Sequence, residues 1–131
     1  MRYIVLAGRV LFVLIFIFAA PRHFSQEGIQ HAADLGTPFA GVLVPLSGLM
    51  AILGGLSVAI GYKARWGAWL LVVFLVPVTL VMHSFWRVDD PALHRVQVAM
   101  FSKNLSMLGA ALLLTYFGTG PLSIDEKEKG K

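Results

Sequence analysis

The sequence contains no cysteine, only four histidines and few charged residues. The absence of cysteine excludes disulfides, thiolate nucleophiles, iron–sulfur clusters and Cys-ligated zinc. None of the histidines has the spacing of a metal-binding pair, and the sequence has no phosphate-binding glycine loop or nucleophile elbow. We therefore predict no catalytic residue, no metal site and no covalently bound cofactor. Any redox chemistry near this chain would use atoms that another molecule supplies.

Charge is too sparse and too scattered for a nucleic-acid-binding protein. Eleven Lys and Arg against seven Asp and Glu give a net charge of +4, and the basic residues lie between hydrophobic blocks instead of on one face. Hydrophobic residues make up 57% of the 131 residues, more than one soluble core of this size can bury. The composition predicts a protein that resides in the lipid bilayer and has no nucleic-acid partner.

Four apolar blocks are long enough to cross a membrane, since a spanning helix needs about 20 residues. They cover residues 3–20, 39–60, 66–85 and 96–117, and proline or glycine stands near most of their ends. We predict an all-α polytopic membrane protein, a four-transmembrane-helix bundle within residues 1–122. Residues 123–131 are rich in charge and predict a disordered tail.

The distribution of Lys and Arg predicts the orientation of the bundle. Six of them lie on the side of the two termini and three on the other side: Arg2, Lys63, Arg65, Lys127, Lys129 and Lys131 against Arg22, Arg87 and Arg95. Because cytoplasmic segments carry the excess of positive charge, we expect both termini in the cytoplasm and the helices in an inner-type membrane.

The connection between the first two blocks, residues 21–38, is the longest of the loops. Phe24, Gly28, Ala32 and Leu35 are spaced to share one face of a helix. This pattern predicts a short helix on the membrane surface, although a polar connector packed over the bundle would fit as well.

Small residues recur every seven positions in the second block, at Ala40, Ser47, Gly54 and Gly61. Helices in lipid associate where small side chains let their backbones approach, so we expect the second block to be the central helix. Gly109 lies in a similar group of small residues in the fourth block.

Three cationic or titratable residues, Arg9, His83 and Lys103, fall inside the apolar blocks, which contain no Asp or Glu. A charged group at membrane depth is costly and points to a function. Two interpretations stay open: the long side chains reach the headgroups or cap backbone carbonyls, or a donor-rich pocket binds a quinone carbonyl, an oxyanion or a lipid headgroup. The candidate binding residues are Arg9, Thr79, His83, Trp86, Lys103 and Asn104.

The order of several short motifs resembles the DoxX family of small bacterial four-helix membrane proteins, up to about Asp125. The likeness rests on these residues: Gly8, Arg9, Phe12 and Phe16, then Gly54, Gly55, Gly61, 63–65, Gly67 and Ala68, then 77–83, Phe85 and Trp86, then 101–105 and Gly109. The resemblance implies an accessory or quinone/oxyanion-binding subunit of a membrane-associated redox system, with an oxidoreductase as partner and Arg9, His83, Lys103 and Asn104 in the site. It implies at most a subunit of a quinone-linked oxidoreductase, since the chain has no nucleophile or cofactor ligands of its own.

Two other functions fit the residues. One is a small anion or solute transporter acting as an oligomer, because Arg9 occupies a place in the first helix where small cation exporters carry an acidic residue. The other is a non-catalytic lipid-binding or assembly module. The sequence alone does not separate these alternatives from the redox hypothesis.

Overall fold

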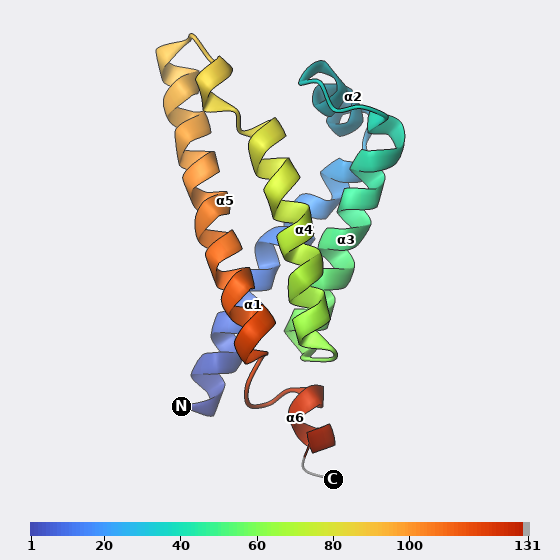
Figure 1. Cartoon of the computed structure of the whole chain (residues 1–131), viewed down its shortest axis with the longest axis vertical. Coiled ribbons are helices and arrows are strands. Elements are labelled where there is room, and N and C mark those ends of the chain that lie inside the picture. The colour runs from blue at the N-terminus through green and yellow to red at the C-terminus, as the bar shows by residue number, and fades with distance from the viewer. Residues whose placement is uncertain (130–131) are drawn as a thin grey trace.

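Every regular element is a helix over the part that the computed structural model describes, residues 1–129 (Figure 1). The elements in order are α1 (Arg2–Ala19), η1 (Ala20–Phe24), α2 (Gln26–Asp34), α3 (Ala40–Ile60), α4 (Ala64–Met82), η2 (Phe85–Arg87), α5 (Pro91–Phe117) and α6 (Ile124–Lys129). Four of these helices, α1, α3, α4 and α5, are long and apolar enough to cross a membrane. The prediction of an all-α polytopic membrane protein is confirmed, and α2 is a short helix in the first loop.

The helix ends have local causes. Helix α5 begins at Pro91, five residues before the predicted block, because the Asp90 side chain accepts a hydrogen bond from Leu93 N at 2.7 Å and proline suits the first helical position. Helix α2 begins in the same way, with Ser25 accepting from Gly28 N at 3.0 Å.

The bundle has two distinct ends, which we name by their contents (Figure 1). The terminal end holds the N-terminus, the turn between α3 and α4, and α6. The loop end holds α2 and the connection between α4 and α5. Helices α3 and α5 run towards the terminal end, so both of their C-termini lie there.

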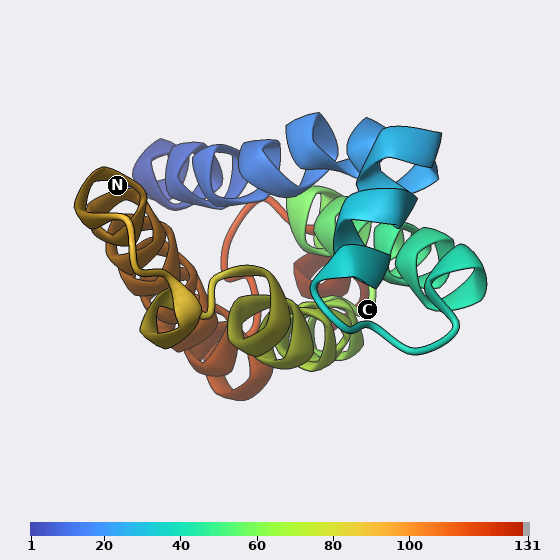
Figure 2. The same cartoon turned by 90° about the horizontal axis from the view of Figure 1, so that it is seen from above.

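The four long helices form a curved row in the order α1, α3, α4, α5 (Figure 2). Each packs on its neighbour in the row, whereas α1 and α5, the outermost two, are not among the helix pairs that pack together extensively. Figure 2 also shows the segment after α5 crossing the space between α5 and α1 before it reaches α6. The row is therefore open on one side and bridged at the terminal end.

The closest approach is between α3 and α4. A Cβ added to Gly54 would lie 2.8 Å from the carbonyl oxygen of Gly67, so only glycine fits there. The core around this crossing includes the fully buried Val58, Leu71 and Leu75. The expected role of Gly54 in helix packing is thus confirmed, whereas a Cβ added to Gly109 would meet no atom within 4 Å, so that Gly109 lies in open space.

The C-terminal stretch is folded, in contrast to the disordered tail that we expected from its charge. Ser123 is 3% exposed, and its hydroxyl accepts a hydrogen bond from Glu126 N at 3.2 Å, which caps α6. The Asp125 carboxylate accepts from Lys63 N at 2.7 Å and from Ala64 N at 2.9 Å. Because α4 begins there without a side-chain cap of its own, Asp125 supplies that cap from a distant part of the sequence. Residues 130–131 of the expected tail lie outside the described residues.

Candidate functional site

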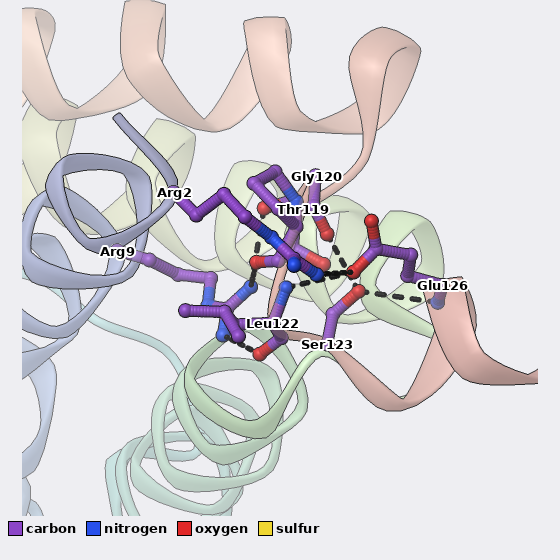
Figure 3. A network of polar contacts seen from close by, with 8 residues as sticks. Arg2, Arg9, Thr119, Gly120, Leu122, Ser123 and Glu126 are labelled. Carbon is purple, nitrogen blue, oxygen red and sulfur yellow. Dashed lines mark hydrogen bonds and ion pairs between the residues drawn. The ribbon is translucent and has the colours of Figure 1, made fainter.

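Arg9 is buried at the terminal end, with 5% of its surface exposed. Its guanidinium donates to four backbone carbonyls, and Figure 3 shows the contacts with Thr119 and Leu122. The bonds are Nε to Ala59 O at 3.1 Å, Nη1 to Thr119 O at 3.1 Å and to Pro121 O at 3.5 Å, and Nη2 to Leu122 O at 2.8 Å. Arginine suits this position because its planar fork offers five donors in different directions.

The carbonyls around Arg9 explain how the charge is tolerated, since no carboxylate among residues 1–129 forms an ion pair with it. Ala59 lies in the last turn of α3, and Thr119 follows the end of α5. Helix C-termini carry partial negative charge from their unpaired carbonyls, and Ala59 O at the end of α3 is one of the acceptors of this guanidinium. Of the two interpretations of Arg9 above, these hydrogen bonds favour capping of carbonyls within the chain.

Glu126 makes two polar contacts at the terminal end. Its Oε2 accepts from Leu122 N at 2.8 Å and lies 3.6 Å from Arg2 Nη2 (Figure 3). Both charged side chains are largely exposed, so this ion pair contributes no more than about 1 kcal/mol. We call residues 118–126 together with Arg9 the C-terminal clasp. It joins α1 to the ends of α3 and α5, and through Asp125 to the start of α4.

The other candidate residues lie near the middle of α5 or towards the loop end, so Arg9 does not belong to their group. Thr79 and Asn104 are 6% and 5% exposed. Asn104 is seven residues from Ala111, on the same helical face, and Ala111 is part of the core. His83, at the end of α4, has its Nδ1 2.9 Å from Gln97 Oε1, so that α4 and α5 are joined by this hydrogen bond.

The aromatic residues around the end of α4 pack on each other. Phe85 has its ring centroid 5.2 Å from that of Trp86 and 5.3 Å from that of Phe101, and His94 lies 5.7 Å away. All of these pairs are edge-to-face, the arrangement that aromatic rings prefer. The cluster holds η2 against α5, and Trp86 remains 53% exposed at its rim.

Lys103 points away from this group. It is exposed, and the hydrogen-bond acceptor near its ammonium is Met100 Sδ, at 3.5 Å. His83 and Asn104 therefore face the contact between α4 and α5, whereas Lys103 faces the surroundings of the bundle. The structure does not bring Lys103 together with His83 and Asn104 in one pocket.

Two open depressions are present, and neither is lined by Thr79, His83 or Lys103. The first, of about 560 Å³, lies beside the C-terminal clasp and is lined in part by Lys63, Arg65 and Thr119. The second, of about 530 Å³, lies on the outer side of α3 and α4 between Met50 and Trp69. Both are shallow hollows on the surface.

The sequence matches the SURF4 family over residues 1–130. The chain belongs to this family. It is 29% identical over 126 residues to the inner membrane protein YphA of Escherichia coli, with 95% of this chain and 89% of that protein covered.

Two eukaryotic relatives match nearly all of this chain. It is 29% identical over 127 residues to the ER-derived vesicles protein ERV29 of Saccharomyces cerevisiae, which covers 97% of this chain and 34% of ERV29. It is 30% identical over 128 residues to the Surfeit locus protein 4 homolog of Schizosaccharomyces pombe, covering 97% of this chain and 38% of the homolog. The SURF4-family chain thus spans about a third of the length of these two relatives. No solved structure matches it.

Membership of the SURF4 family overturns the DoxX resemblance, and with it the assignments of a redox subunit, a bound quinone and an oxidoreductase partner. The residues that carried the resemblance explain the error. Gly54 and Gly67 serve helix packing, and Phe85, Trp86 and Phe101 pack on each other. These motifs therefore report how four helices fit together and carry no information about a reaction.

Sequence reasoning missed three residues that matter to these contacts. Gln97, the partner of His83, stood in a block that was judged only by its hydropathy. Asp125 and Glu126 were assigned to a disordered tail. The signal for them was present: Ser123 and Glu126 have the spacing of a capping box, which marks a helix start.

Proposed function

We propose that this SURF4-family chain is a non-enzymatic membrane receptor, which binds a partner protein within the bilayer. The observation that carries the proposal is the open row of helices, whose outermost members α1 and α5 do not pack extensively on each other. Helix α5 bears small and polar side chains on exposed positions, among them Ser102, Ser106 and Gly109. In lipid, small residues let a second helix approach closely and hydroxyls bond across the contact.

The names of two relatives are compatible with a membrane receptor. YphA is named as an inner membrane protein and ERV29 as a protein of ER-derived vesicles. Neither name refers to a reaction. A receptor role also agrees with a bundle whose intramembrane arginine is already bound by the chain's own carbonyls.

Photo-crosslinking from inside the membrane tests the receptor. A photoreactive amino acid at Gly109, which has open space around it, is expected to give one reproducible protein adduct in cells of the source organism. The matched control is the same group at Gly55, where a Cβ would meet Val13 at 3.2 Å, and there we expect crosslinks only within the chain. Lipid adducts alone at Gly109 would contradict a receptor function.

For the location we propose the cytoplasmic membrane of a bacterium, with both termini in the cytoplasm. The support is the charge distribution: Lys63 and Arg65 lie at the terminal end, beside the clasp. Cytoplasmic segments carry the excess of Lys and Arg in most membrane proteins.

The absence of cysteine allows a clean test of this orientation. Ala33→Cys in α2 and Lys127→Cys in α6 both place the thiol at an exposed position, at opposite ends of the bundle. In intact cells we expect a membrane-impermeant maleimide to label only Ala33→Cys, and in opened cells both. Labelling of Lys127→Cys in intact cells would reverse the orientation.

A further inference from the structure

The surface of helix α5 divides into three sectors around the helix axis. Asn104 and Ala111 mark the sector that is buried against the bundle. Leu105 and Leu112, 54% and 46% exposed, mark an apolar sector of the kind that faces lipid chains. The third sector, which we call the polar face, is exposed, carries Arg95, Ala99, Ser102, Lys103, Ser106 and Gly109, and ends at the apolar Leu113 one turn further on.

Lys103 lies near the middle of α5. It is the thirteenth residue of the 27-residue helix, about 18 Å along the axis at about 1.5 Å per residue. The acceptor near its ammonium among residues 1–129 is a weak one, Met100 Sδ at 3.5 Å. An ammonium at this depth that faces lipid is energetically costly. This situation is the opposite of that of Arg9, whose charge the chain itself surrounds.

The chain has no acidic group to offer Lys103. All seven Asp and Glu residues lie outside the four spanning helices. A second copy of the chain has the same lack, and two copies packed through their polar faces would bring one Lys103 towards the other. Like charges at low dielectric repel strongly, so this face is unsuited to a symmetric dimer.

The rest of the polar face suits a helix better than a lipid. Ser102, Ser106 and Gly109 recur at four and three residues, so they lie in one stripe next to Lys103. Their small side chains leave a shallow surface, and the space above Gly109 is open to 4 Å. A flexible acyl chain gains little from such a surface, whereas a helix backbone can approach it closely.

From these observations we infer that the polar face binds a transmembrane helix of another protein, and that this helix carries an Asp or Glu at the depth of Lys103. The inference rests on the proposed receptor function and specifies the partner by its chemistry. A carboxylate would compensate the ammonium where water is absent, and the stripe of small residues would set the distance between the two helices.

Binding of two designed transmembrane peptides tests this inference directly. Both are Leu/Ala helices of equal length that differ in one central residue, Glu or Gln, and binding to the full chain is measured by energy transfer in phosphatidylcholine vesicles. We expect the Glu peptide to bind about tenfold more tightly than the Gln peptide, a difference of the size found for polar contacts between membrane helices. Equal binding of the two peptides would overturn the inference.

Variants of the receptor provide the controls. Lys103→Met should remove the preference for the Glu peptide, whereas Leu105→Met, on the apolar sector, should retain it. Lys103→Glu should transfer the preference to a peptide with a central Lys. Because Lys103 and Leu105 are both exposed, all three variants are expected to melt within a few degrees of the wild type. Loss of Glu-peptide binding in a Lys103 variant that still melts normally counts for the inference. An unchanged preference in Lys103→Met counts against it.

Three further outcomes separate this inference from its alternatives and from the receptor function. If vesicles with one fifth phosphatidylglycerol abolish binding of the Glu peptide, an anionic lipid occupies the polar face and the inference fails. If the protein crosslinked from Gly109 has no Asp or Glu within its spans, the inference fails while the receptor function stands. If Gly109 gives no protein adduct at all, the receptor function itself fails.

Discussion

Replacement of Arg9 by leucine is expected to lower the free energy of unfolding by about 3–5 kcal/mol, because it leaves buried carbonyls without their charged donor. Leucine fills a similar volume, so the loss reflects the hydrogen bonds to Ala59, Thr119 and Leu122 more than a cavity. The measurement is denaturant or thermal unfolding of the purified protein in a mild detergent. Arg9→Lys should recover only part of the loss, since one ammonium cannot reach carbonyls in several directions.

Arg2→Leu is the matched control for this prediction. It removes an arginine from the same helix and the same end of the bundle, but Arg2 is exposed and its ion pair with Glu126 is long, at 3.6 Å. We expect a change of less than about 1 kcal/mol. Equal destabilisation by Arg2→Leu and Arg9→Leu would show that general charge at the terminal end matters and the specific carbonyl contacts do not.

Gly61→Ala is expected to have the second largest effect, about 2–4 kcal/mol, from backbone strain and a steric clash together. Gly61 has φ of +69°, and a Cβ there would lie within 2.9 Å of the Thr119 hydroxyl and still closer to the Ser123 side chain. The clash should displace the C-terminal clasp, so proteolysis after Lys127 or within residues 118–126 should become faster. Thermal unfolding and limited proteolysis of the same sample measure both effects.

Gly36→Ala separates strain from clash. Gly36 also has a positive φ, +93°, but a Cβ added there would meet no atom within 4 Å. This variant should lose only the strain energy, about 1–2 kcal/mol, and the clasp should resist protease as in the wild type. If protease cleaved the clasp equally fast in Gly61→Ala and Gly36→Ala, the contact between Gly61 and the clasp would be refuted.

The spanning helices could be predicted from the sequence because hydropathy and length alone decide whether a segment crosses a membrane. The starts of α2 and α5 depend on the local caps of Ser25 and Asp90, which are also visible in the sequence. The fold of the C-terminal stretch depends on contacts that span most of the chain, such as Asp125 with the start of α4. Charge content alone pointed to disorder there, since it does not show that these charges have partners.

The candidate site was predictable only in part, for a related reason. The sequence showed that Arg9 and Lys103 lie in apolar blocks without an acidic residue, and the four spanning helices contain none. It could not show that Arg9 binds backbone carbonyls. Every residue has a carbonyl, and only the fold determines which carbonyls lack a hydrogen-bond donor. Nor could it show that Lys103 and Asn104, adjacent in sequence, belong to different sectors of α5 with opposite surroundings.

The most direct test of the account is hydrogen–deuterium exchange of the amides in residues 119–126, with the protein in lipid nanodiscs. The central claim is that the buried Arg9 is held by the chain's own C-terminal segment. In the wild type we expect these amides to exchange slowly, and in Arg9→Leu to exchange at the rate of an unstructured peptide while α3 and α4 stay protected. Rapid exchange of these amides in the wild type would contradict the claim.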